Sequence, residues 1–278
     1  MTTSPADGSG GTALTGYVDL WWQAVDDFTT LLEKVPAEQW STPTDLPGWD
    51  VHAVAAHTAH LESLLAGGEH VDVEVGDAPH ARGMMGQFTE QGVVARRDAS
   101  PDDLINEIRA AATARHTALL ADPPTDPDAP APGVFGAIGW STLTLLRNRP
   151  LDLWMHEQDV RRAVGLPGGM GADAAAHTTD YLSESLGYVL AKRVGAEPGT
   201  TVVLEVEGHP PVGATVTAEG RGRLLDEVPT EPTAGLRTDR ESFVLLAGGR
   251  REPEPGRVEV FGDADLAHRL LAGLAVTP

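Results

Sequence analysis

One stretch in the middle of the chain reads RPLDLWMHEQD and covers residues 149–159. Its Asp152 and His156 are four residues apart, so on a helix they share one face, which also carries Val160 and Ala163. A carboxylate and an imidazole on an apolar helix face are costly unless they pair with each other or coordinate a metal. The stretch therefore predicts a buried helix of a bundle, with a polar pair that points inward.

A histidine on an earlier helix also points inward. That helix is expected to begin at Asp50, a typical N-cap residue, and its apolar periodicity places His57 on the buried face. His52 falls on the opposite, solvent face and His60 lies at the edge. A single inward histidine is more often a hydrogen-bonded core residue than a metal ligand, so His57 alone leaves both interpretations open.

Two helices of one bundle can bring His57 against Asp152 and His156. Two imidazoles and one carboxylate with an open fourth position are how catalytic zinc is held. The same ligand types suit nickel, iron or copper, so zinc is the leading candidate among several divalent metals. The alternative is an internal Asp–His hydrogen bond or a solvated pair. Asp159 lies on nearly the same side as a reserve carboxylate, and His60 is a candidate fourth ligand that would close the site.

Helical periodicity marks the rest of the N-terminal part. Apolar residues recur at three- and four-residue steps over residues 14–35, as on the buried face of a helix. Ser100, followed by proline and two acidic residues, is expected to begin a helix that continues to Ala121. A further helix is expected over residues 141–164, and Pro150 inside it should kink it or split it in two.

The pattern changes after a Pro/Gly hinge at residues 166–169. One more helix is expected over residues 172–194, and short strands and helices follow it. The expected strands cover residues 202–207, 212–218, 224–228 and 258–261, and the expected helices cover residues 242–247 and 265–274. The change places a domain boundary near residue 168. We therefore expect a helical bundle over residues 1–168 and a smaller α/β domain over residues 169–278.

The composition excludes several classes of partner and chemistry. The chain has 41 acidic and 20 basic residues, a formal net charge of −21, which argues against nucleic acid and anionic membranes as partners. It has no Cys, so disulfides and cysteine nucleophiles are excluded, and any thiol must arrive on a cosubstrate. Residues 1–11 lack the features of a signal peptide, and no stretch approaches the roughly 20 apolar residues of a membrane span. We expect a cytoplasmic protein.

Two segments resemble those of the mycothiol-dependent maleylpyruvate isomerases. LPGWDV at residues 46–51, followed by AAH at residues 55–57, resembles the first signature of this family, and residues 149–159 resemble its second metal segment. The resemblance implies an N-terminal four-helix bundle of the DinB type. In the family such a bundle binds a divalent metal through a histidine on the second helix and a carboxylate–histidine pair on the fourth.

Carried over to this chain, the metal ligands that the resemblance implies are His57, Asp152 and His156. The best-known members of the family have Glu at the position of Asp152, so this chain departs from them by one methylene. Residues 236–239 (LRTD) and 243–250 (FVLLAGGR) resemble the family's C-terminal domain, which is similar to sterol-carrier-protein folds.

An arginine in this late segment is important for isomerase activity in the family, and Arg250 is the best positional match, which makes it the candidate catalytic residue. Its guanidinium could hold a carboxylate of the substrate or thiol by a bidentate contact. The resemblance implies an enzyme that uses a divalent metal and mycothiol, a low-molecular-weight thiol, to attack an electrophilic small molecule. Reversible addition would give cis–trans isomerisation, and a lasting adduct would make the protein a thiol S-transferase. The alternative is a non-catalytic small-molecule or metal-binding protein whose smaller domain offers an apolar groove.

Overall fold

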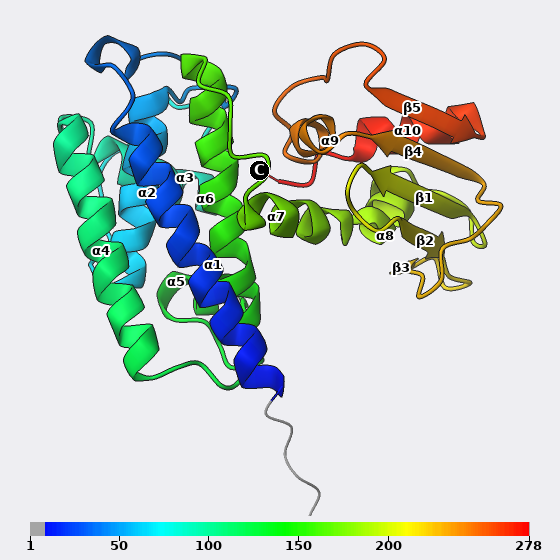
Figure 1. Ribbon diagram of the computed structural model, residues 1–278, viewed down its shortest axis with the longest axis horizontal. Coiled ribbons are helices and arrows are strands. Elements are labelled where there is room, and N and C mark those ends of the chain that lie inside the picture. The colour runs from blue at the N-terminus through cyan, green and yellow to red at the C-terminus, as the bar shows by residue number, and fades with distance from the viewer. Residues whose placement is uncertain (1–8, 278) are drawn as a thin grey trace, which may run out of the picture. The chain divides into compact units, whose positions relative to one another are not determined.

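The computed structural model describes residues 9–277 of the chain, which divides into two compact units, Met1–Gly169 and Met170–Pro278. The first unit is helical, and the second holds a mixed sheet with helices (Figure 1). The predicted fold class is therefore confirmed, whereas separate folding of the two units stays a prediction. Among the helices of residues 9–277, none combines the length and the apolar character needed to cross a bilayer.

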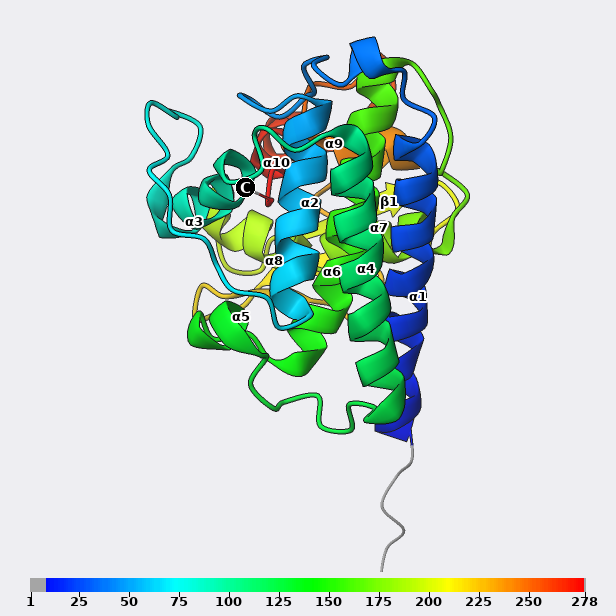
Figure 2. The ribbon, with the colours of Figure 1, turned by 90° about the vertical axis from the view of Figure 1, so that its left-hand side faces the viewer.

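Four long helices form a bundle in the first unit, in which each helix packs against two others (Figure 2). Helix α1 contacts α4 and α6, and α2 contacts the same two helices. The four helices span Ser9–Leu32 (α1), Val51–Leu65 (α2), Pro101–Ala121 (α4) and Thr142–Val164 (α6). The shorter helical segments are η1 (Ala37–Gln39), α3 (Gly83–Val94) and α5 (Gly133–Ala137).

Local sequence fixes where three of the bundle helices begin. The side chains of Asp50, Ser100 and Ser141 each accept a hydrogen bond from a backbone N–H in the first turn of α2, α4 and α6. Asp103 completes a capping box with Ser100, as the acidic start of that helix predicts. Each such cap stabilises a helix by about 1 kcal/mol. Gly165 ends α6 with a positive φ of 67°, a conformation that glycine adopts without strain.

Helix α6 runs through Pro150 without interruption. The prediction that Pro150 splits this helix is therefore wrong. Proline removes one backbone hydrogen bond, but α6 packs against α1 and α2, and its side chains are buried on both sides of the proline, as Leu146 and Trp154 are. Burial of these large side chains outweighs the lost hydrogen bond. Asp152 and His156 thus lie on one continuous helix.

The second unit contains a five-stranded sheet with the order β3-β2-β1-β4-β5. Strands β1 and β4 are parallel, and all other neighbours are antiparallel. The strands span Thr201–Val206 (β1), Val212–Val216 (β2), Gly222–Leu224 (β3), Ala234–Thr238 (β4) and Val258–Gly262 (β5). The helical segments are α7 (Asp173–Ser183), α8 (Leu186–Tyr188), η2 (Val189–Arg193), α9 (Arg240–Ala247) and α10 (Ala264–Gly273). Helix α10 packs on β4 and β5, and α8 packs on β2 and β3.

Two expectations for this unit are wrong. The single helix expected over residues 172–194 is three segments, α7, α8 and η2, of which the last is a π-helical turn. The strand expected at 224–228 lies earlier, at β3, and strand β4 was not expected at all. Strand β4 lies between β1 and β5, and four of its five residues are buried, so it lacks the polar–apolar alternation that marks a half-exposed strand.

Candidate metal centre

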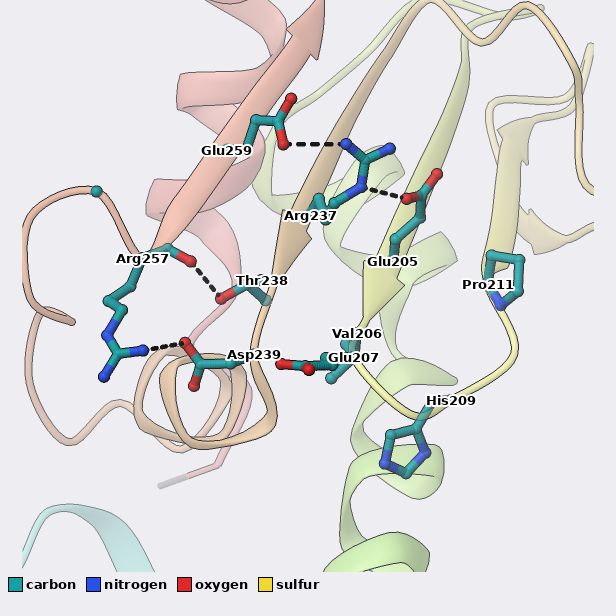
Figure 3. Close-up of a pocket in the computed structure, with 11 residues that line it drawn as sticks. Glu205, Val206, Glu207, His209, Pro211, Arg237, Thr238, Asp239, Arg257 and Glu259 are labelled. Atoms are coloured by element: carbon teal, nitrogen blue, oxygen red, sulfur yellow. Dashed lines mark hydrogen bonds and ion pairs between the residues drawn. The ribbon is translucent and has the colours of Figure 1, made fainter.

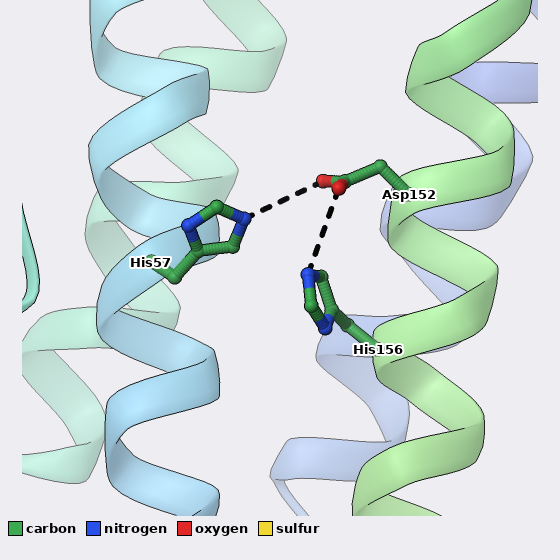
Figure 4. A group of neighbouring side chains, drawn as sticks. All are labelled: His57, Asp152 and His156. Atoms are coloured by element: carbon green, nitrogen blue, oxygen red, sulfur yellow. Dashed lines mark ion pairs between the residues drawn. The ribbon is translucent and has the colours of Figure 1, made fainter. Parts of the chain in front are cut away.

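Three polar side chains meet in the interior of the bundle, one from α2 and two from α6 (Figure 4). Nε2 of His57 lies 3.7 Å from Oδ2 of Asp152, and Nε2 of His156 lies 3.6 Å from Oδ1 of the same carboxylate. One ligand atom from each residue lies within 4.8 Å of the other two. These separations are too long for good hydrogen bonds. Donor atoms about 2.1 Å from one tetrahedral cation lie roughly 3.4 Å apart, so three atoms within 4.8 Å of one another could hold a shared metal after a small approach of the side chains.

The hydrogen bonding of His57 supports this fit. Only 5% of the residue is exposed, yet within residues 9–277 neither ring nitrogen has a hydrogen-bond partner. A buried polar atom left unpaired costs about 1–3 kcal/mol. A divalent cation between the two helices would accept the lone pair of Nε2. The shorter side chain of Asp152 is sufficient, because its two oxygens already lie at similar distances from the two imidazoles.

His156 is oriented from its other side. Its Nδ1 lies 3.3 Å from Oδ2 of Asp159, which is fully buried. Arg162 donates to Oδ1 of Asp159 at 2.6 Å and to Asp45 at 2.7 Å. A carboxylate behind a histidine fixes the ring so that Nε2 faces the metal, as is usual in metal sites. Asp159, the reserve carboxylate, therefore lies outside the candidate ligand group, as an ion-pair partner of its member His156.

Asp152 is held by a side chain that the sequence did not single out. Arg149 donates to Oδ2 of Asp152 at 2.8 Å and to Oε1 of Glu62 at 2.6 and 3.2 Å. Arg149 is 1% exposed and Glu62 is fully buried. Trp21 donates to the same Glu62 oxygen at 3.2 Å. The signal for this contact in the sequence is the spacing of three residues between Arg149 and Asp152, which places them on one face of α6.

The surroundings shift the pKa values of all three candidate ligands. Burial lowers the pKa of His57, and the nearby Asp152 only partly offsets it, so this imidazole is neutral and able to bind a metal. Burial would raise the pKa of the Asp152 carboxyl, but the charges of Arg149 and His156 outweigh burial and hold it well below its usual value. Burial would lower the pKa of His156, but Asp152 and Asp159 raise it, so a cation competes with a proton there.

The LPGW segment contributes one side of the site. The Trp49 ring lies 4.9 Å from the His57 ring and 6.1 Å from the His156 ring, measured between centroids. Its Nε1 donates to Glu90 at 2.9 Å, and His80 binds the same carboxylate oxygen at 3.0 Å. Trp49 therefore shields the imidazoles from water, while its indole N–H donates a hydrogen bond to Glu90 of α3.

The other predicted histidines lie elsewhere. His60 is buried, but its ring nitrogens face Arg96 and His70, both at 3.3 Å, so it lies outside the candidate ligand group. His52, expected on the solvent face, is half-buried and bonds to the Ala99 carbonyl at 2.8 Å.

Glu157, which follows His156, is 1% exposed and pairs with Arg161 at 2.6 Å. It is buried because α6 is covered on more than one side. Burial raises the pKa of the Glu157 carboxyl, while Arg161 opposes that shift.

Arg250, the candidate catalytic residue, lies in the second unit just after α9. Its Nη1 donates to the Gly248 carbonyl at 2.7 Å, and the side chain is half-buried. The same unit has a hollow of about 730 Å³ at the ends of β1 and β4, lined mainly by charged side chains (Figure 3). Arg237 lines it and pairs with Glu205 at 2.6 Å and Glu259 at 3.0 Å. Arg250 is not among the lining residues, and its catalytic role stays a proposal.

The buried His60 predicts a specific pH dependence of stability. Burial, followed by the Arg96 charge, lowers its pKa from 6.5 to about 3. The folded state therefore excludes a proton that the unfolded chain binds below about pH 6.5, so stability falls as the pH falls toward 3. The contribution of one such group approaches about 1.4 kcal/mol per pH unit. In the metal-free protein, His60→Gln should show a shallower loss of stability between about pH 6 and pH 4.

Urea unfolding followed by tryptophan fluorescence measures this slope with a signal that comes from the first unit, because all six Trp residues lie before residue 170. Equal slopes in the wild type and the His60→Gln variant would contradict the assignment.

Comparison with known proteins agrees with this architecture. Residues 21–161 match the family model described as the mycothiol maleylpyruvate isomerase N-terminal domain, and residues 176–269 match the model of the C-terminal domain of the same family. Two uncharacterized proteins of Mycobacterium tuberculosis, MT0041 of strain CDC 1551 / Oshkosh and Rv0036c of strain ATCC 25618 / H37Rv, are each 25% identical over 167 residues. These matches cover 56% of this chain and 62% of each relative, so the chain spans under two thirds of their length.

Two solved structures share the fold. They are crystal structures of the mycothiol-dependent maleylpyruvate isomerase and of a mutant of it, with 18% and 17% identity and a TM-score of 0.56 in both cases. Each match covers 94% of this chain and 95% of the other. The order of domains, the fold and the two family matches lead to one conclusion: the chain belongs to the mycothiol maleylpyruvate isomerase family.

Proposed function

We propose that this protein is a metal-dependent enzyme that activates a low-molecular-weight thiol for attack on an electrophilic small molecule. The observation that carries the proposal is the buried group of His57, Asp152 and His156, in which the His57 ring nitrogens form no hydrogen bond with any of residues 9–277. Family membership makes mycothiol the proposed thiol. The chain has no Cys, so the thiol must come from outside.

The donor set fits a divalent metal, with zinc as the proposed occupant. Two imidazoles and one carboxylate are three protein ligands, which is the number that catalytic zinc sites use, and one position remains for a substrate. A structural zinc site would be closed by a fourth protein ligand. His60, the nearest candidate for that place, bonds to Arg96 and His70 instead. When bound, the metal supplies Lewis acidity that lowers the pKa of a thiol and favours its thiolate form.

The surrounding residues prepare the site for this chemistry. Asp159 holds the His156 ring in one orientation, so little reorganisation is needed when a ligand arrives. Trp49 covers the imidazoles and limits the entry of water, which strengthens electrostatic interactions inside the site. Asp152 is the one candidate ligand that is partly open to solvent, with 23% of its side chain exposed.

Two reactions are consistent with an activated thiolate. If it adds reversibly to a conjugated double bond, the new single bond can rotate, and elimination of the thiol leaves the other geometric isomer. If the adduct is stable, the protein is a thiol S-transferase. We propose the isomerase type first because the family and the two solved structures carry that name. Arg250 is the proposed group for holding a substrate carboxylate.

The second candidate is a non-catalytic binding protein with an apolar groove in the smaller domain. The hollow in the second unit gives this candidate little support, because Glu205, Arg237, Asp239, Arg257 and Glu259 line it. Dependence of turnover or ligand binding on an added thiol separates the two candidates.

Metal content tests the ligand assignment. The wild type should bind about one divalent metal per chain, as three protein ligands around one position predict. His57→Ala and His156→Ala should each strip the metal while keeping most of the helix content, measured by elemental mass spectrometry and circular dichroism. His52→Ala is the matched control on the same helix and should keep the metal, since His52 bonds to the Ala99 carbonyl. Full metal occupancy in the His57→Ala/His156→Ala double variant would rule the assignment out.

Thiol binding tests the proposed chemistry. A metal should lower the thiol pKa from about 8.5 to below neutrality, so binding at neutral pH should release a proton. Calorimetric titration of metal-loaded protein with mycothiol in two buffers of different ionisation enthalpy measures that release. The His156→Ala apoprotein should show none. Equal affinity of mycothiol for metal-loaded protein and for apoprotein would refute the mechanism and favour the binding-protein candidate.

A further inference from the structure

We propose that Arg149 is a positioning residue of the metal site. By holding Oδ2 of Asp152, it leaves Oδ1 as the oxygen available to a cation, so the carboxylate binds through one oxygen and a coordination position stays open for the thiol. This inference rests on the proposed function and explains how the chain keeps the site open.

The two imidazoles by themselves do not select one oxygen of Asp152. His57 is nearest to Oδ2, at 3.7 Å, and His156 is nearest to Oδ1, at 3.6 Å. Figure 4 shows the carboxylate between the two rings, with one oxygen toward each. A cation bound to both rings would therefore lie at similar distances from both oxygens. Carboxylates bind cations through one oxygen or through both, and this arrangement alone would favour both.

Arg149 removes this symmetry. Its Nη1 donates to Oδ2 at 2.8 Å, a distance typical of a strong charge-assisted hydrogen bond. The guanidinium also carries a positive charge, which repels a second cation from that side of the carboxylate. Both effects direct the cation to Oδ1, the oxygen that faces His156.

Glu62 keeps Arg149 in place. Oε1 of Glu62 accepts bonds from Nη2 and Nε of Arg149, at 2.6 and 3.2 Å, and a third bond from Trp21. With 1% of Arg149 and none of Glu62 exposed, the ion pair between them is shielded from water. A buried ion pair is weak evidence for stability, because an apolar pair of similar size is often as stable. What an apolar pair could not do is hold one oxygen of Asp152.

The number of oxygens bound matters for the thiol. Two imidazoles and one carboxylate oxygen leave a fourth tetrahedral position, which is the place proposed for the thiol. A carboxylate bound through both oxygens would occupy that position itself. Loss of Arg149 should therefore weaken thiol binding and leave metal binding intact, whereas general damage to the site would weaken both.

Arg149→Met tests this inference, with Arg115→Met as the matched control. Arg115 is also buried, and its partners are the other oxygen of Glu62, at 3.7 Å, and the Trp21 ring. Both variants remove one buried cation beside Glu62, but only Arg149 binds Asp152. If Arg149→Met does not fold, Glu62→Gln/Arg149→Met takes its place, because it leaves no unpaired carboxylate at residue 62. Zinc affinity is measured by competition with a chromophoric chelator, and mycothiol affinity by titration of the zinc-loaded protein.

Arg149→Met should bind mycothiol at least about 10-fold more weakly, the lower end of the effect that residues around a metal site have on its affinity or activity. Zinc affinity should stay unchanged or become tighter, because the second oxygen of Asp152 takes the open position. Arg115→Met should change neither affinity. An unchanged mycothiol affinity in Arg149→Met, or a parallel loss of both affinities in the two variants, would overturn the inference.

The binding mode of the carboxylate is read separately from crystal structures of the zinc-loaded proteins. Only Arg149→Met should have both Asp152 oxygens on the metal, and a single bound oxygen in both proteins would also overturn the inference. If the zinc-loaded wild type binds no thiol, the proposed function fails, and this structural comparison still decides the role of Arg149.

Discussion

Two imidazole rings and a carboxylate lie together between α2 and α6, where each would be unfavourable alone. Most of the polar structure of the first unit follows from this constraint. Asp152 forms an ion pair with Arg149, which in turn pairs with Glu62. His156 pairs with Asp159, which in turn pairs with Arg162. The charges alternate in sign outward from the site, so each buried group has a partner of opposite charge or a neutral ring beside it. Such connected networks hold side chains in one arrangement.

Helix α6 carries most of this network. Arg149, Asp152, His156, Asp159 and Arg162 follow one another at steps of three and four residues, which places them in a row along the helix. An uninterrupted helix through Pro150 is therefore a requirement of the site, because a split would separate Arg149 from the residues that follow. The LPGW segment is tied to the same row at two points. Asp45 of the preceding turn binds Arg162, and the Trp49 ring lies against His57 and His156.

The sequence predicted the parts of the fold that depend on local patterns. Asp50 and Ser100 cap the helices that they were expected to begin, and the inward direction of His57 followed from helical periodicity. Strand β4 was missed because a strand buried on both faces has no alternation, and η2 because a π-helical turn has no pattern of its own.

The grouping of the three candidate ligands could be predicted from the sequence, and the residues that contact them could not. Asp152 and His156 share an apolar face, which is a signal that a single helix carries. Arg149 and Glu62 come from different helices, so their pairing depends on how α2 and α6 pack, and each one looks like an ordinary surface charge in its own segment. His60 and Asp159 differ from their predicted roles for a similar reason. The packing of the helices brings Arg96 against His60, and Arg162 in the next turn of α6 pairs with Asp159.

The central claim is that His57, Asp152 and His156 hold one metal and leave one position for an external thiol. Crystals of zinc-loaded protein grown with mycothiol test it most directly, with anomalous scattering recorded at the zinc absorption edge. The claim predicts one zinc peak between α2 and α6, within about 2.0–2.2 Å of both Nε2 atoms and of Oδ1 of Asp152, with the thiol sulfur at about 2.3 Å as the fourth ligand. A zinc ion bound elsewhere would contradict the claim. So would a zinc ion at this site that has a protein side chain as its fourth ligand and no mycothiol bound to it.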